Sequence, residues 1–346
     1  MAVPGRGGID RLNAWLRACA RSRQVWVPRR SDRPKAGWRM VPWSAEDGLD
    51  LEGYRNTLLP PKEIFFPRWE PMLRYSGWGR NLRWEEVRAP SAGRPAVLFG
   101  VRPCDARSLT VLDAVFQDDH PDPYYLQRRR AVVVVVLACT TPGRSCFCAD
   151  VGGGPADERG ADVMAAELEG EIRMWPVTDK GAQLLAETGW EPDPGGRELL
   201  EQHMQRTPTP AHGVPAGRYP EALEGRFEDP VWDRLHLPCL GCASCTYLCP
   251  TCHCFDVADE TSDGGGLRVR GWDSCMFALY TLHASGHNPR PSVKERFRNR
   301  FMHKLSYFPK RYGLLACVGC GRCVEHCPVN VDVREVMKEL VSDVQS

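Results

Sequence analysis

The sequence predicts an α/β N-terminal domain followed by a mainly helical C-terminal domain that is rich in cysteine. Three observations favour this fold class. Residues 1–190 alternate between strand-like apolar runs and segments with helical periodicity. Residues 191–230 are rich in proline, glycine and threonine, which is typical of a connection between domains. Residues 231–346 contain eleven of the sixteen cysteines, most of them in two runs of the same spacing.

The clearest part of the N-terminal domain is a strand, a helix and a second strand in succession. Residues 96–101 form an apolar run, and Asp105–Phe116 places its apolar residues at helical spacing. Residues 131–138 include five consecutive valines, which predicts a strand buried on both faces, as in a parallel sheet. This order predicts a βαβ unit with a right-handed crossover.

The other elements follow from shorter patterns. We expect irregular structure over residues 57–95 and a flexible glycine loop at residues 264–266. Strands are expected at residues 24–27, 38–43 and 172–177. Helices are expected at residues 9–20, 157–168, 179–187, 197–205, 276–284 and 293–305.

Composition excludes several classes of protein. The formal net charge of +1 provides no strong field for nucleic acid or a membrane surface. The N-terminal residues lack the apolar segment of a signal peptide, and the longest apolar run, Ala131–Cys139, is far shorter than the roughly 20 residues that span a bilayer. No dinucleotide fingerprint or phosphate-binding loop is visible. We therefore expect a soluble, cytoplasmic protein, in which clustered cysteines hold metal more often than they form disulfides.

Two cysteine runs repeat the spacing C-x2-C-x2-C-x3-C-P of bacterial two-cluster ferredoxins. In that arrangement three cysteines bind one [4Fe–4S] cluster and the fourth reaches the other cluster. The sequence therefore predicts a ferredoxin-like domain with two clusters. One cluster is assigned to Cys239, Cys242, Cys245 and Cys327, and the other to Cys317, Cys320, Cys323 and Cys249. Structural zinc is the alternative, but zinc sites need neither four cysteines in a run nor the following proline.

A second group of cysteines lies in the predicted α/β domain. Cys104 follows the first strand of the βαβ unit and Cys139 follows the second, with Cys146 and Cys148 a few residues later. Parallel strands carry their carboxyl ends to one edge of the sheet, where open α/β folds bind ligands. These four cysteines therefore predict a third [4Fe–4S] cluster, and the alternative is a set of buried free thiols.

The two ferredoxin-type runs are separated by a long insert, which is basic near its end. Its positive charges are either a solvated helix face or a docking surface for an acidic partner. Cys252, Cys254 and Cys275 have no assigned role, and a separate zinc site that includes His253 is possible.

Four segments together resemble the iron–sulfur beta subunit of cytosolic sulfhydrogenases, and also the related iron–sulfur subunit of anaerobic sulfite reductases. The first is residues 317–323 with His303-Lys304-Leu305 upstream, and the second is residues 249–252 with residues 272–275 downstream. The third is residues 100–105, and the fourth is residues 122–125 together with residues 146–148. The resemblance extends from about residue 57 to the C-terminal part of the chain.

This resemblance implies a protein that relays electrons between two partners. One is a flavoprotein subunit that uses FAD and NAD(P)H, and the other is a NiFe hydrogenase or a sulfite reductase subunit. Two alternatives stay open: a catalytic reductase of sulfur compounds, and an iron–sulfur adaptor of a heterodisulfide-reductase-like complex. The cysteine runs are complete, which argues against a cluster with an open catalytic iron.

Overall fold

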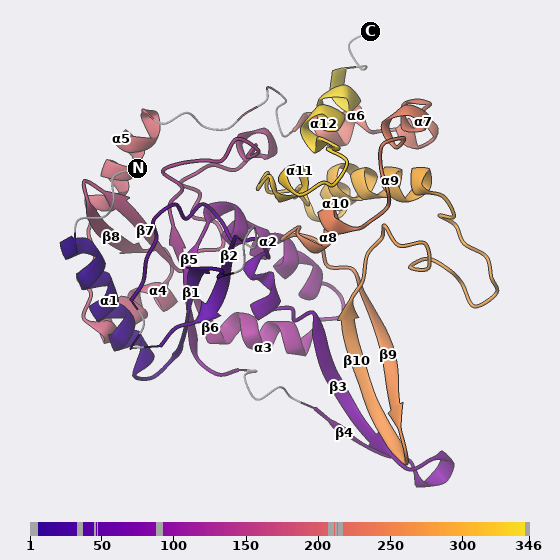
Figure 1. Ribbon diagram of the computed structural model, residues 1–346, viewed down its shortest axis with the longest axis horizontal. Helices are drawn as coiled ribbons and strands as arrows, with labels where there is room; N and C mark the ends of the chain where they lie inside the picture. Colours follow the sequence, from indigo (N-terminus) through magenta and orange to yellow (C-terminus); the bar gives the residue numbers. More distant parts are fainter. Residues whose placement is uncertain are drawn as a thin grey trace.

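The computed structural model describes residues 6–342, except 33–36, 45, 47, 88–92, 207–210, 212 and 214–216 (Figure 1). The Thr-Pro-Thr-Pro stretch of the expected linker, residues 207–210, lies outside the described residues. Within the described part of the chain, no helix has the length and apolar character needed to cross a membrane.

A six-stranded sheet forms the centre of the N-terminal half. Its order is β2-β1-β5-β6-β7-β8; β1, β5, β6 and β7 are parallel, and the two edge strands are antiparallel. The strands are β1 (Gln24–Arg30), β2 (Trp38–Pro42), β5 (Ala96–Val101), β6 (Val132–Leu137), β7 (Val163–Leu168) and β8 (Glu171–Pro176). The predicted α/β fold and its βαβ unit are confirmed, because β5 and β6 pair in parallel.

Helices cover both faces of this sheet. Alternate valines of β6 point to opposite faces: Val133 and Val135 pack in one apolar core, and Val134 and Val136 pack in the other. Helices α1 (Arg6–Ala20) and α4 (Asp179–Thr188) contribute to the first core. Helices α2 (Pro103–Phe116), α3 (Pro123–Ala131) and α5 (Gly196–Gln205) contribute to the second. The run of valines is therefore buried on both faces, as predicted.

Two predicted helices are wrong. Residues 163–168 of the segment 157–168 form β7, which pairs with β6 and β8. Its sequence, Val-Met-Ala-Ala-Glu-Leu, contains good helix formers, but pairing inside the sheet overrides this weak local preference. Residues 276–284 form turns rather than a helix.

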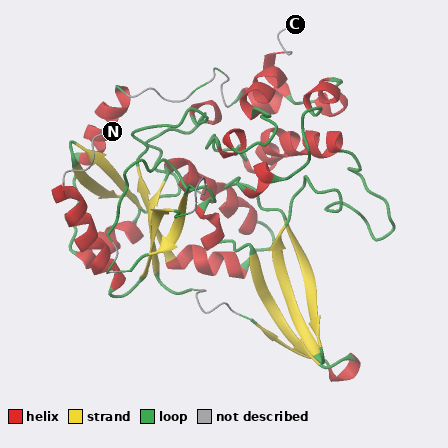
Figure 2. Ribbon diagram, viewed as in Figure 1, coloured by secondary structure: helices red, strands yellow, loops and turns green. Residues whose placement is uncertain are grey.

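A second, antiparallel sheet projects from the body of the molecule as an arm (Figures 1 and 2). Its order is β4-β3-β10-β9, with β3 (Trp69–Ser76), β4 (Arg83–Glu86), β9 (Phe255–Ser262) and β10 (Gly265–Trp272). The expectation of irregular structure over 57–95 is therefore wrong for β3 and β4, and the prediction of a mainly helical C-terminal part missed the hairpin β9–β10. The arm joins strands from both sides of the predicted domain boundary, which itself stays a prediction.

The hairpin turn and the base of the arm have clear physical causes. Asp263-Gly264 connects β9 to β10 as a two-residue turn, and Gly264 has a φ of +81°. The glycines after it belong to β10, so the expected flexible loop is wrong. At the base of the arm, buried Arg270 pairs with buried Glu70 at 2.5 Å and also with Asp122 at the start of α3. Arg270 and Glu70 both belong to the arm, so the pair with Asp122 is the one that joins the arm to the start of α3.

Short helices surround the two ferredoxin-type runs. Their shared core includes Trp232, Phe297, Phe301 and Leu340. The helices are α6 (Arg218–Ala222), α7 (Val231–Leu235), α8 (Ser244–Tyr247), α9 (Val293–Met302), α10 (Phe308–Tyr312), α11 (Arg322–Glu325) and α12 (Val333–Ser342). A π-helical turn, His303–Tyr307, joins α9 to α10, and 3-10 turns occur at Pro61–Ile64, Gly79–Asn81, Ala149–Val151 and Arg226–Glu228. A capping box between Ser292 and Glu295 starts α9.

Candidate iron–sulfur sites

The eight cysteines of the two runs line two cavities in the crossed grouping that the spacing predicts. The first cavity is lined by Cys239, Cys242, Cys245 and Cys327. The second is lined by Cys249, Cys317, Cys320 and Cys323. Cys323 of the second run also borders the first cavity, so it lies in the wall between the two. Four thiols around a cavity are the donor set that a [4Fe–4S] cluster requires.

Glycines let the backbone of each run turn tightly around its cavity. Gly241, Gly319 and Gly321 have φ values of +69°, +64° and +77°, a region that other residues enter only with strain. The turns aim backbone N–H groups at cysteine sulfur. The N–H of Gly241 donates to Cys239 Sγ at 3.4 Å, and the N–H of Val331 donates to Cys327 Sγ at 3.2 Å. Such hydrogen bonds stabilise negative charge on sulfur.

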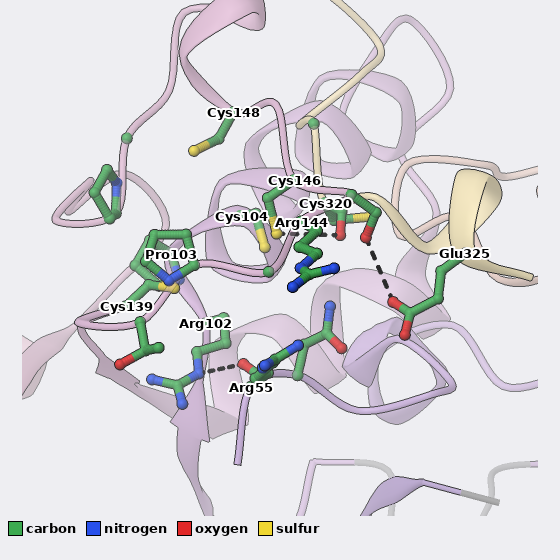
Figure 3. Close-up of a pocket in the computed structure, with 18 residues that line it drawn as sticks. Arg55, Arg102, Pro103, Cys104, Cys139, Arg144, Cys146, Cys148, Cys320 and Glu325 are labelled. Atoms are coloured by element: carbon green, nitrogen blue, oxygen red, sulfur yellow. Dashed lines mark hydrogen bonds between the residues drawn. The ribbon is translucent and has the colours of Figure 1, made fainter. Parts of the chain in front are cut away.

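The four cysteines of the α/β part line a third cavity of about 260 Å³. Cys104 lies at the start of α2 directly after β5, Cys139 follows β6, and Cys146 and Cys148 lie on the next loop (Figure 3). Arg102 fixes this edge of the sheet, because its guanidinium donates to the carbonyl oxygen of Ala138 at 2.8 Å and also to those of Tyr54 and Arg55. The structure thus brings together the four cysteines that we predicted to converge.

The three cavities form a row in which neighbours share walls. Cys323 and Arg300 line both the first and the second cavity. Cys320 and Gly319 line both the second and the third. Neighbouring cavities are therefore adjacent, with cysteine and glycine or arginine residues in the walls between them.

The loop that carries Cys146 and Cys148 contacts the second cysteine run directly. The N–H of Phe147 donates to the carbonyl oxygen of Gly319 at 2.8 Å. A Cβ at Gly319 would lie 2.5 Å from the carbonyl carbon of Phe147, so only glycine allows this approach. Arg322, in the same run, forms a bidentate ion pair with Asp105 at 2.6 and 2.8 Å, and both side chains are 1% exposed. Arg322 also donates to the carbonyl oxygen of Thr57 at 2.8 Å.

Positive charges lie at the walls of the cavities. Lys304 donates to Cys249 Sγ at 3.4 Å, to Thr251 Oγ1 at 3.0 Å and to the carbonyl oxygen of Ala316 at 2.9 Å. Buried Arg300 lies between the first two cavities, and its Nε has no hydrogen-bond partner among the described residues. A buried donor without a partner is costly, so an anionic cluster beside Arg300 fits this site.

Burial alone works against ionised thiols here. It raises the pKa of the Cys148 thiol to about 11 and that of Cys320 to about 12. For Lys304, burial lowers the pKa, but negative charge on Cys249 and Cys252 raises it by more, so the ammonium group stays charged. Iron and these cations are the groups that offset the burial of thiolates.

The basic stretch of the insert is divided between the interior and the surface. Arg296, Arg298 and Arg300 are buried and so belong to neither a solvated face nor a docking surface. Lys310 and Arg311 are 50% and 60% exposed, so the two interpretations stay open for that end of the stretch. Sequence reasoning also missed Lys62, a buried lysine whose ammonium group donates to the carbonyl oxygen of Cys252 at 2.6 Å. No cysteine lies near Lys62 in the sequence, so no local pattern identifies it.

The remaining cysteines line none of these three cavities. A hydrogen bond from the Cys275 thiol lowers the pKa of Cys254, and a hydrogen bond to Cys249 raises the pKa of Cys252. His253 is half-buried, and desolvation lowers its pKa to about 3. Over the described residues, no three His, Cys, Asp or Glu side chains are placed to hold a single metal ion, and the zinc site with His253 stays a prediction. A four-iron cluster holds its thiolates farther apart than one zinc ion does, whose bonds to sulfur are about 2.3 Å.

Comparison with known proteins agrees with this geometry. Residues 238–331 match the family described as a 4Fe-4S dicluster domain, which implies two [4Fe–4S] clusters. The chain is also similar to the sulfhydrogenase 2 subunit beta of Pyrococcus furiosus, with 32% identity over 317 residues that cover 89% of this chain and 90% of the relative. No solved structure matches the chain.

Proposed function

Because the chain belongs to the family of the sulfhydrogenase beta subunit, we propose that it relays single electrons through iron–sulfur clusters in a cytoplasmic redox complex. The electrons pass between a flavoprotein partner, which is linked to NAD(P)H, and a catalytic metal subunit of the NiFe hydrogenase or sulfite reductase type. The observation that carries this proposal is the row of three cysteine-lined cavities with shared walls. Bound clusters supply one-electron chemistry, and the chain holds them close together.

The two ferredoxin-type clusters are assigned to the crossed cysteine sets that line the first and second cavities. The chain contributes the ligands, the N–H groups that face sulfur, and the cations Arg300 and Lys304. Reduction adds negative charge to a cluster, so a nearby cation favours the reduced state. These two side chains therefore raise the reduction potentials of the clusters beside them.

A third [4Fe–4S] cluster is assigned to Cys104, Cys139, Cys146 and Cys148. Its support is the convergence of these thiols on one cavity and the direct packing of residues 145–148 on the second run. Cys320 forms the wall between this cavity and the second one, which extends the row into the α/β part of the chain.

The proposal is tested in the complex purified anaerobically from its host. NAD(P)H should bleach the absorption of the clusters near 400 nm, and removal of this chain should stop electron transfer to the catalytic subunit while the flavin is still reduced. The isolated chain should carry out no turnover of its own. Continued transfer in the absence of this chain would refute the relay.

One observation supports a second candidate function. The third cavity, at about 260 Å³, is much wider than the other two, at about 30 Å³ each, and the exposed Arg55 and Arg144 lie at its edge. That site has room for a small anionic sulfur compound beside the thiols. Reduction of polysulfide by the isolated, chemically reduced chain would favour a catalytic reductase over a relay.

A further inference from the structure

The first cavity opens onto an apolar surface. Cys242, one of the four cysteines assigned to its cluster, is exposed to solvent, unlike the cysteines of the other two cavities, which are partly or fully buried. Five apolar side chains on the flanking segments are exposed: Leu237 (70%), Leu240 (65%), Phe277 (38%), Leu279 (75%) and Leu282 (46%). We call these five residues, with Cys242, the Leu240 surface. Single exposed leucines are ordinary, but a group of them beside a cofactor site is a mark of an interaction site.

The two segments that form this surface contact each other. A Cβ at Gly241 would lie 3.8 Å from the carbonyl oxygen of Met276, and the rings of Tyr247 and Phe277 are 6.0 Å apart. The outer loop is held by its own hydrogen bonds: Thr281 donates to Asn288 Oδ1 at 2.8 Å, and Asn288 Nδ2 donates to the carbonyl oxygen of Ala278 at 2.7 Å. The loop therefore presents its leucines to solvent in a fixed arrangement.

The sequence of both segments is free of permanent charge. No aspartate, glutamate, lysine or arginine occurs from Leu235 to Phe255, or from Ser274 to Pro289. In a chain with 26% charged residues, two such stretches are unusual for exposed structure. The centres of protein interfaces are depleted in charge, and permanent interfaces are more apolar than transient ones.

We propose that the Leu240 surface is the docking face for a different protein subunit, which stays bound and carries its own redox centre. This inference rests on the proposed function, because it identifies the end of the row at which electrons pass to that partner. The partner should present an uncharged, apolar face, since a charged face would be buried here without counter-charges. A mobile electron carrier guided by charge does not fit this surface.

The position of Cys242 gives the surface its role in electron transfer. A cluster bound through an exposed cysteine lies at the molecular surface, so a partner on the Leu240 surface would contact its ligand directly. The other end of the row is different, because the third cavity carries the exposed charged side chains Arg55, Arg144 and Glu325 at its edge. The two ends thus suit partners of different chemistry, which a relay between two subunits requires.

Photo-crosslinking in the assembled complex tests the proposal without disrupting the surface. A photoreactive phenylalanine analogue is placed at Leu240 or, as a control, at Leu82, which is 50% exposed on the arm. The expected result is an adduct from position 240 to a different polypeptide that contains flavin, haem or metal. An adduct to a second copy of this chain, or no protein adduct, would overturn the proposal.

A matched pair of variants provides a second readout. The double variant Leu237→Asp/Leu279→Asp changes two exposed residues that do not line the first cavity. It should keep its iron but retain at least tenfold less of the cofactor-bearing subunit, whereas Leu82→Asp should retain it fully. Retention of that subunit by the double variant would contradict the docking face. If the wild-type chain itself contained no iron–sulfur cluster, the proposed function would fail instead, so the two failures are distinguishable.

Discussion

Replacing Asp105 with asparagine removes one charge from the buried ion pair that joins α2 to the second cysteine run. The substitution keeps the size of the side chain, so packing is largely preserved. It leaves the guanidinium of Arg322, 1% exposed, without its counter-charge. In the wild-type chain burial lowers the pKa of Arg322, but negative charge on Asp105 and Cys320 raises it by more, so the pKa lies well above its usual value. Because a guanidinium group keeps its proton in proteins, Arg322 stays charged in the variant as well.

The expected loss follows from what an unpaired buried charge costs. Removing one partner of a buried ion pair destabilises a protein by about 3–5 kcal/mol. Unfolding entropy near the melting temperature is about 2.1 cal/mol/K per residue, so a chain of 346 residues has about 0.7 kcal/mol/K. Dividing the loss by this entropy gives a decrease in melting temperature of about 4–7 °C.

The assay is anaerobic thermal unfolding of the cluster-loaded chain, with a control of the same geometry. Arg268 and Asp259 form a bidentate pair at 2.9 and 2.8 Å on the arm, but their side chains are 50% and 40% exposed. Asp259→Asn should leave the melting temperature almost unchanged, because solvent screens an exposed ion pair. Equal shifts for the buried and the exposed variant would refute the reasoning.

Three further predictions concern the cavities. Cys249→Ala should damage the cluster of the second run and spare that of the first, as shown by site-resolved EPR signals. Lys304→Met removes a charge-assisted hydrogen bond to Cys249 and should therefore lower the reduction potential of the second cluster by tens of mV. For one electron, 59 mV corresponds to about 1.4 kcal/mol. Gly319→Ala should place a Cβ 2.5 Å from the Phe147 carbonyl carbon and reduce the iron content at the second and third cavities.

Each of these changes has a matched control. Cys327→Ala should show the mirror pattern, with damage at the first cluster, and identical damage from both cysteine variants would contradict the crossed ligation. Lys310→Met removes an exposed lysine and should leave the potentials unchanged. Gly313→Ala has a similar φ of +69° but open space around the new Cβ, so its iron content should stay normal. An effect of Gly313→Ala as large as that of Gly319→Ala would show that backbone strain, not the close approach to Phe147, is responsible.

The convergence of cysteines could be predicted because the necessary signals are local. The valine run of β6 and the apolar run of β5 identify parallel strands, and such strands place Cys104 and Cys139 at one edge of the sheet. The spacing of the two ferredoxin-type runs likewise predicts which thiols meet. In both cases a few residues of sequence determine the geometry.

Other features depend on partners far away in the sequence. The strand β7 contains helix formers, and only its pairing with β6 makes it a strand. The hairpin β9–β10 pairs with β3, almost two hundred residues earlier in the chain, although the Asp263-Gly264 turn was a usable local signal. The sequence of α9 is compatible with a solvated basic face, but three of its arginines are buried. Arg300 lies beside cysteines of two cavities, and this contact depends on segments far away in the sequence.

Iron analysis of the anaerobically purified chain tests the row of three clusters most directly. The expected content of the wild-type chain is about twelve irons, with acid-labile sulfide in equal amount. The double variant Cys146→Ser/Cys148→Ser should lose about four irons and keep its ferredoxin-type clusters. About eight irons in the wild-type chain, unchanged in the double variant, would contradict the third cluster, and zinc in place of iron would contradict all three.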